Sequence, residues 1–396
     1  LFNVMRGGAF LRGYEVAADR FRSFVTDRNR EVAQRHADWL EHLPESLDVA
    51  DLRHQAAEQG DPNLVRLAAE YLPLAFSRRH GDPSRPWNHF AIRVRDERGD
   101  PLLSYQGNWR DIFQNWEALC RSYPGFLPSI VAKFLNASTA DGFNPYRITS
   151  EGIDWEVLEP DNPWAGIGYW GDHQIVYLYR LLKAQEDHSP GWLVDELGRQ
   201  AYTFADVPYR IAPFDELLRH PKATVEFDHD AETAAENRVE RLGADGKLLE
   251  NANGEIVHVS MLEKLLIPAL AKLSNFVPRG GIWMNTERPE WNDANNALVG
   301  YGLSMVTLAH LRRYLEMLDD LTADLTHECA ISADVRSWAG QFTSVLESHQ
   351  SLVDAPEIDE RDRAQMLSEL GGVYSEYRAA LYERGLSGTE SVGVPL

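Results

Sequence analysis

The chain has 396 residues, of which 39 are basic and 61 acidic, so its formal net charge is −22 at pH 7. Nucleic acids and anionic membranes repel such a protein, which argues against either as the main partner. An apolar content of 44% is ordinary for a globular protein, and the length suffices for a sizeable core. A neutral small molecule, or an anion held locally by arginine, fits this composition better.

No apolar run approaches the roughly 20 residues that a transmembrane helix needs, and no signal peptide is apparent. The two cysteines, Cys120 and Cys329, are far apart in segments with helical patterns. This arrangement indicates neither a disulfide framework nor a metal cluster. We therefore expect a cytoplasmic protein that needs no metal or other cofactor, with both cysteines buried as apolar side chains.

Apolar residues recur at spacings of three and four along most of the chain, which predicts helices. In chain order these are residues 12–43, 46–59, 62–79, 109–122, 125–137, 172–185, 192–200, 214–219, 261–275, 303–321, 333–352 and 360–385. Ser46 is suited to be the N-cap of the second helix. Because twelve helices can close as six concentric hairpins, the pattern predicts an all-α protein with an (α/α)6 toroid.

Two regions interrupt the helical pattern with short strand-like stretches. Residues 90–94 and 101–105 flank a turn, and residues 239–242, 247–249 and 255–259 are separated by Asp-Gly and Asn-Gly dipeptides. We expect these to be β-hairpin excursions from the helical scaffold. The Pro- and Gly-rich connectors are too short to separate domains. Residues 1–387 are therefore predicted to form one barrel domain, and residues 388–396 a frayed tail.

The most informative segment places Asp293 between Trp291-Asn292 and a further amide, Asn296, just before an apolar helix. Cleavage of a glycosidic bond needs an aromatic surface for the sugar ring, amides for its hydroxyls and a carboxylic acid to protonate the leaving oxygen. The alternative is an Asx-rich helix N-cap, because Asn and Asp side chains accept hydrogen bonds from free backbone N–H groups. The segment alone leaves both interpretations open.

A second polar junction begins the predicted helix at Trp109. There, Asp111 and Asn115 share one face of the helix, as do Arg110 and Gln114, so a charged pair and two amides can point into one cavity. The structural alternative is a helix start whose first-turn carboxylate is favoured by the helix dipole.

A third junction reads Tyr169-Trp170-Gly171-Asp172-His173 and again leads into an apolar helix. Its glycines allow close approach of a ligand, and Tyr169 and Trp170 offer a stacking surface. His173 is a candidate proton carrier or phosphate ligand. Alternatively, Asp172 caps the helix and His173 packs in the core.

Two cationic sites are candidates for binding an anion. Arg279 stands beside two glycines, and Arg78, Arg79 and His80 gather in an otherwise acidic chain. The alternatives are a plain glycine turn and a salt-bridged surface loop, respectively.

The order of these motifs resembles the catalytic (α/α)6 barrel of the inverting glycoside phosphorylases that act on cellobiose and chitobiose, or a related six-hairpin glycosidase. The counterparts are Trp109-Arg110-Asp111-x-x-Gln114, Tyr169-Trp170-Gly171-Asp172-His173 and Trp291-Asn292-Asp293. The resemblance covers residues 105–320. It implies that Asp293 donates the proton, that Arg110 and Asp111 bind the sugar at the cleavage site, and that phosphate is the nucleophile. The chain departs from that family in the downstream phosphate-binding segments and flanking β-domains, which have no match here.

Together these motifs predict a carbohydrate-active enzyme that cleaves the glycosidic bond of a di- or oligosaccharide with inversion. For hydrolysis, Asp111 or Asp172 would activate water about 6.5–9.5 Å from the acid. For phosphorolysis, inorganic phosphate is the co-substrate, with Arg279, Arg78, Arg79 and His80 as candidate ligands. The predicted substrate-binding residues are Trp109, Arg110, Gln114, Tyr169, Trp170, His173, Trp291, Asn292 and Asn296. The alternative is a non-catalytic carbohydrate-binding or scaffold protein on the same barrel.

Overall fold

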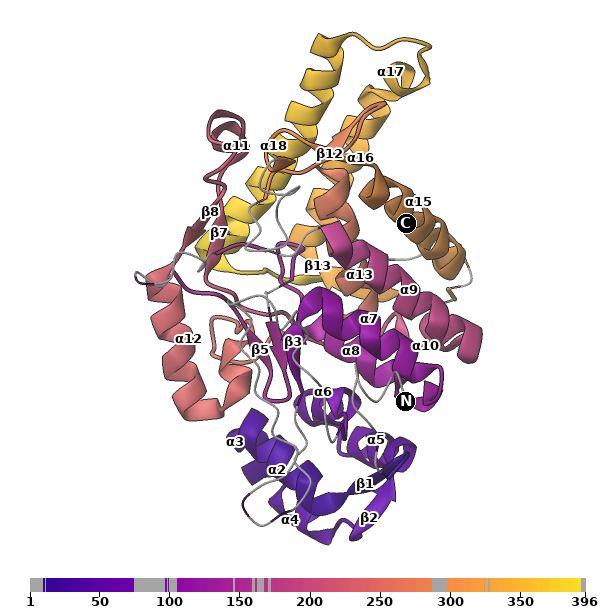
Figure 1. The fold of residues 1–396 in the computed structure, drawn as a ribbon, viewed down its shortest axis with the longest axis vertical. Helices are drawn as coiled ribbons and strands as arrows, with labels where there is room; N and C mark the ends of the chain where they lie inside the picture. The colour runs from indigo at the N-terminus through magenta and orange to yellow at the C-terminus, as the bar shows by residue number, and fades with distance from the viewer. Residues whose placement is uncertain are drawn as a thin grey trace.

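The computed structural model describes residues 10, 12–74, 97, 99, 105–144, 147–158, 161, 167–169, 172–286, 298–323, 325–326 and 328–392. For residues 106–111, 172–173 and 353–354 it describes only the backbone. This part of the chain is mostly helical, with short strands in small antiparallel sheets (Figure 1). The elements α2 to α5 gather at one end of the molecule, and the long helices α16 and α18 pack together at the other.

The helices lie close to where the apolar spacing predicts them, apart from two exceptions described below and the helix predicted over residues 62–79, which ends at Glu70 because the backbone of Tyr71 is extended. They are α2 (Ala18–Arg28), α3 (Arg30–Arg35), α4 (Ala37–His42), α5 (Val49–Glu58), α6 (Pro62–Glu70), α7 (Trp109–Cys120), α8 (Leu127–Asn136), α9 (Asp172–His188), α10 (Trp192–Glu196), α11 (Phe214–Arg219), α12 (His229–Leu242), α13 (Met261–Leu273), α15 (Met305–Ala323), α16 (Ala333–Ser348), α17 (Gln350–Asp354) and α18 (Glu360–Arg384). This composition agrees with an all-α fold, whereas closure into six hairpins stays a prediction.

The strands are two to four residues long, and many lead directly into a helix. They are β1 (Glu15–Ala17), β2 (Ser46–Asp48), β3 (Gln106–Asn108), β4 (Arg147–Thr149), β5 (Ile153–Asp154), β6 (Gln200–Tyr202), β7 (Tyr209–Ile211), β8 (Val225–Phe227), β9 (Val259–Ser260), β10 (Phe276–Val277), β11 (Gly281–Trp283), β12 (Leu303–Ser304), β13 (Cys329–Ser332) and β14 (Thr389–Val392). The pair β1–β2, for example, is antiparallel, so α2 and α5 begin at its opposite ends. The strand pairs therefore connect the chain segments that precede the helices.

The prediction of one helix over residues 12–43 is wrong, because local capping interrupts the apolar periodicity. Asn29 has an extended backbone (φ −151°, ψ 100°), and its side chain accepts a hydrogen bond from the N–H of Val32. This N-cap ends α2 and starts α3. Capping also corrects the start of α5, where Asp48 accepts from the N–H of Ala50 while Ser46 lies in β2.

The strand predicted at residues 239–242 is wrong as well, because these residues form the last turn of α12. Asp228 caps this helix by accepting from the N–H of Ala231, and the helix sequence is rich in Ala, Glu and Arg, which are strong helix formers. The Asp245-Gly246 dipeptide lies in a 3₁₀ turn, η2 (Ala244–Lys247). The second predicted turn is confirmed, since Glu250 bridges Ile256 across it.

The C-terminal tail is ordered over residues 389–392, which corrects the prediction of a frayed end. Strand β14 pairs antiparallel with β13, and Val392 stands opposite Cys329. Both side chains are buried, so the pairing is supported by apolar packing. Cys120 is buried too, which confirms the expected environment of both thiols.

The centre of the molecule contains two helices, α8 and α13, that are buried on nearly all sides. Helix α13 packs against α8, α9, α15 and α16, and all but two of its residues are buried. A helix that is apolar all round needs such a fully enclosed position, whereas the surrounding helices bury only one face. None of the described helices has both the length and the apolar character of a membrane-spanning segment.

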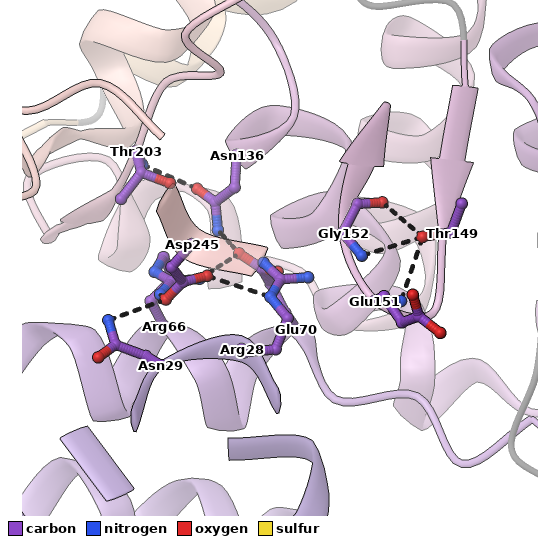
Figure 2. A network of polar contacts seen from close by, with 10 residues as sticks. All are labelled: Arg28, Asn29, Arg66, Glu70, Asn136, Thr149, Glu151, Gly152, Thr203 and Asp245. Atoms are coloured by element: carbon purple, nitrogen blue, oxygen red, sulfur yellow. Dashed lines mark hydrogen bonds and ion pairs between the residues drawn. The ribbon is translucent and has the colours of Figure 1, made fainter. Parts of the chain in front are cut away.

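Four buried charges join the N-terminal elements to the rest of the protein (Figure 2). Arg28 donates from Nε to Asp245 Oδ1 over 3.1 Å and from Nη2 to Glu70 Oε2 over 3.0 Å. Arg66 donates from Nη1 to Glu70 Oε1 over 3.2 Å and from Nη2 to Asp245 Oδ2. Two carboxylates thus balance two guanidinium groups, as burial of charge requires.

Amide side chains extend this network to neighbouring backbone. Asn136 donates to Glu70 Oε1 over 2.8 Å and accepts from the N–H of Thr203 over 3.0 Å. Asn29, which caps α3, donates to Asp245 Oδ2 over 3.1 Å. The network therefore connects α2, α6, η2 and the last turn of α8 in one buried cluster.

The network changes the acidity of its members. Burial opposes ionisation of Glu70, but the charges of Arg28, Arg66 and Lys133 outweigh it and lower the pKa of this carboxyl to about 2. Burial and the charge of Arg28 lower the pKa of Lys133 to about 7. Glu70 therefore stays ionised throughout the neutral range, and its charge is part of the folded state.

Replacement of Glu70 by Gln should lower the free energy of unfolding by about 3–5 kcal/mol near pH 7. The reason is that two buried guanidinium groups would then share a single carboxylate, that of Asp245. The pKa of Glu70 is depressed from its ordinary 4.5 to about 2, so its contribution is complete above pH 4.5 and is lost as the pH falls toward 2. Urea unfolding from pH 2.5 to 7 should show a difference between the two proteins that shrinks on acidification. The exposed Glu58→Gln is the control, and equal losses in both variants would contradict the role of the network.

Candidate functional site

The predicted junction at Trp109 is built by a strand that leads into a helix. Strand β3 pairs with β4 and runs directly into α7, so that Trp109 is the first helical residue. Arg110 and Asp111 follow in the first turn, where only the backbone is described. Gln114, one turn further on, is exposed to solvent.

The predicted junction at Tyr169 contributes a stack of aromatic rings. Tyr169 is buried and lies parallel to Phe143, with 5.0 Å between ring centroids. The edge of Tyr209 meets the Tyr169 ring at 5.2 Å. Such pairs hold a side chain in one orientation, and burial raises the pKa of the Tyr169 hydroxyl.

Helix α9 begins at Asp172, as predicted, although the side chains of Asp172 and His173 are not described. The next residue, Gln174, is fully buried and donates from Nε2 to Asn144 Oδ1 over 2.9 Å. The start of α9 is thereby fixed to the loop that follows α8. Trp170 lies outside the described residues.

The candidate anion ligand Arg279 lies in the turn between β10 and β11. This residue has a positive φ of 56°, and its guanidinium donates to the backbone carbonyls of Ala355 and Pro356. The side chain is exposed, and these two hydrogen bonds tie it to the segment between α17 and α18.

The segment that carries Trp291, Asn292, Asp293 and Asn296 lies outside the described residues, as do Arg78, Arg79 and His80. Its two flanks are described and are hydrogen-bonded to each other. Met284 donates its N–H to the carbonyl of Gly302 over 3.0 Å and accepts from the N–H of Gly300. The two described flanks of the segment therefore lie next to each other, at Met284 and at Gly300–Gly302.

A small hollow opens beside these flanks, and its lining combines amides, hydroxyls, aromatic rings and one cation. The lining residues are Phe143, Lys272, Asn275, Ile282, Trp283, Met284, Asn285, Thr286, Ser304 and Thr307. Asn285 donates to Asn275 Oδ1 over 2.6 Å. The Lys272 ammonium lies 4.3 Å from the centroid of the Phe143 ring, a cation–π contact that helps to hold a charge on a buried side chain.

The ring stack connects this hollow with a larger one on the other side. Phe143 lines the small hollow, and Tyr169 lines a cavity of about 340 Å³ together with Asp141, Arg210 and Tyr382. Asp141 is buried and accepts from the Tyr382 hydroxyl over 2.7 Å. The flanks of the Asp293 segment and the junction at Tyr169 thus meet around the Phe143–Tyr169 ring pair.

Sequence reasoning missed several of these residues. Lys272 carries a detectable signal, because it is a cation in the last turn of an almost wholly apolar helix. Asn275, Ser304 and Thr307 carry none, because single amides and hydroxyls at helix ends are usually caps. Among the described residues, no group of three or more His, Cys, Asp or Glu side chains is placed to hold a metal ion.

Residues 10–73 are similar to glycoside hydrolase family 149 insertion domain 1. The match supports a protein of glycoside hydrolase or phosphorylase type. It covers β1 to α6 and therefore includes Arg28, Arg66 and Glu70 of the buried network. No curated protein matches the chain.

Replacement of Tyr169 by Leu should lower the free energy of unfolding by about 1–3 kcal/mol, because both ring contacts are lost and a space is left. Tyr169→Phe keeps both contacts and is the matched control. Guanidinium unfolding of the two variants measures the difference. Equal destabilisation of both would mean that the hydroxyl, and not the ring stack, orients this side chain.

Proposed function

We propose that this protein cleaves a glycosidic bond with inversion of configuration and that Asp293 is the general acid. The observation that carries the proposal is the position of the flanks of the Trp291-Asn292-Asp293 segment. Both flanks border a hollow lined by amides, hydroxyls and an aromatic stack, which are the groups that bind sugars. The similarity of residues 10–73 to an insertion domain of a glycoside hydrolase family supports the same class of substrate.

In this proposal, Trp291, Asn292 and Asn296 bind the sugar beside the acid, and Tyr169 contributes through the ring stack. The starts of α7 and α9 supply the remaining groups, namely Trp109, Arg110, Gln114, Trp170 and His173. A neighbouring indole and other carboxylates would raise the pKa of Asp293, so that it carries a proton near neutral pH. The resemblance to inverting phosphorylases further implies that the helices close into an (α/α)6 barrel.

The attacking group distinguishes two forms of the proposal. In a phosphorylase, phosphate attacks the sugar, with Arg78, Arg79, His80 and Arg279 as candidate ligands. Two N–H groups of Arg279 already bind backbone carbonyls, so this residue can reach phosphate only through its remaining donors. In a hydrolase, Asp111 or Asp172 activates water, and both residues are placed in first helical turns.

Replacement of Asp293 by Asn should abolish turnover, by at least about a hundredfold, because the amide cannot protonate the leaving oxygen. Folding should be unchanged, as judged by circular dichroism and thermal unfolding. Chromatographic detection of the monosaccharide and sugar 1-phosphate formed from a panel of β-linked disaccharides and short oligosaccharides, with phosphate present, measures activity. Near-wild-type turnover in this variant refutes the assignment.

The same panel, incubated with and without inorganic phosphate, separates the two forms. Sugar 1-phosphate that appears only with phosphate identifies a phosphorylase, and free sugar in both incubations identifies a hydrolase. Sugar binding without any product, unaffected by Asp293→Asn, would instead identify a carbohydrate-binding protein.

A further inference from the structure

A small pocket lies beside the buried charge network, between α2, α8, η2 and the turn that joins β4 to β5. Its volume is about 10 Å³, which is room for one group of the size of a water molecule. Its polar lining comes from Arg28, Glu70, Lys133 and Asn136, and all of these except Lys133 are drawn in Figure 2. The described lining residues differ from those of the hollows at the candidate functional site.

Lys133 brings a charged group with free hydrogen-bonding capacity to this pocket. The residue is 2% exposed, and its Nζ lies 5.2 Å from the centroid of the Tyr105 ring. It donates no hydrogen bond to any described residue, yet it keeps accessible surface, unlike the fully enclosed Nε of Arg66. The charges of Arg28 and Glu70 act on this ammonium, which places it beside the part of the network that lines the pocket.

Arg28 contributes a second free donor. Its Nε and Nη2 bind Asp245 and Glu70, whereas Nη1 has no hydrogen-bond partner in the described part of the chain and is not fully enclosed. Nη1 lies 3.6 Å from the position that a Cβ atom on Gly152 would take. Because Gly152 lines the pocket and has no side chain, Nη1 is open to the same space as Lys133.

The charged cluster around the pocket has an excess of positive charge. Arg28, Arg66 and Lys133 interact with two carboxylates, Glu70 and Asp245, so one positive charge has no counter-ion among the described residues. Burial and the charge of Arg28 lower the pKa of Lys133 to about 7, which is the effect of surroundings that oppose its charge. An unbalanced buried charge is costly, and a bound anion removes that cost.

We infer that this pocket binds one chloride ion, which accepts from Lys133 Nζ and Arg28 Nη1 and supplies the missing negative charge. Both groups can only donate, so their ligand must accept. A water molecule also accepts, but it leaves the excess charge unbalanced. Phosphate and sulfate are too large for a space of this size. Glu70 does not compete for these donors, because Arg28 Nη2, Arg66 and Asn136 already donate to its oxygens.

Urea unfolding in sodium chloride and in sodium gluconate of equal ionic strength separates a bound chloride ion from general screening. At about pH 6, below the pKa of Lys133, this side chain carries its proton. For a Kd of about 10 mM, about 100 mM chloride should lower the unfolding equilibrium constant about tenfold relative to gluconate. Lys133→Gln should remove this difference between the salts, whereas the exposed Lys183→Gln should keep it.

A second variant tests the pocket without removing a charge. Gly152→Ala places a methyl group 3.6 Å from Arg28 Nη1 and should reduce the difference between the salts. Crystals soaked in sodium bromide locate the ion directly, because bromide replaces chloride and scatters anomalously. We expect an anomalous peak between Lys133 Nζ and Arg28 Nη1. These two measurements decide the question even if Lys133→Gln does not fold.

Three results would overturn the inference: equal unfolding of the wild-type protein in both salts, an equal chloride effect in Lys133→Gln and the wild type, or no anomalous peak in the pocket. None of these measurements uses catalytic activity. A failure of the proposed role of Asp293 would therefore leave the outcome unchanged.

Discussion

The structure depends on the pairing of Arg28 and Arg66 with Glu70 and Asp245 in the protein interior. None of these charges can be buried alone, because the desolvation of an unpaired ion exceeds the stability margin of most domains. The four side chains come from α2, α6 and η2, so these elements must assemble together. The segment that resembles an insertion domain is therefore built into the core of this protein.

The same network positions the candidate functional site. Asn136, the last residue of α8, connects Glu70 to the backbone of Thr203 through hydrogen bonds to both. The chain then forms the loop that carries Phe143, which lines the small hollow, and Asn144, which accepts a hydrogen bond from Gln174. A chain of direct contacts thus runs from the buried charges to the aromatic stack at Tyr169. Rigid support of this kind is what a binding site needs to keep its groups in register.

Apolar periodicity predicted most helices, because a helix that packs on a core must repeat its apolar residues every three to four positions. It failed where a local interaction outweighed the repeat. Asn29 splits one predicted helix by capping, and residues 239–242 form the end of α12 instead of the predicted strand because the helix formers upstream extend the helix through them. For the candidate site, the starts of α7 and α9 were predicted, as was Tyr169. Lys272 was not, although a cation near the end of a mostly apolar helix is a detectable signal. The amide pair Asn275–Asn285 was not, since isolated amides carry no pattern.

The sequence by itself determined where helices begin and which segments concentrate aromatic and amide side chains, because both are properties of neighbouring residues. Only the tertiary structure decided which distant groups meet. Arg28 and Asp245 are 217 residues apart, and the flanks of the Asp293 segment meet the Phe143 ring only in the folded protein. Burial is a collective result of packing, and it converts ordinary polar residues into charges that need partners and acceptors that need donors.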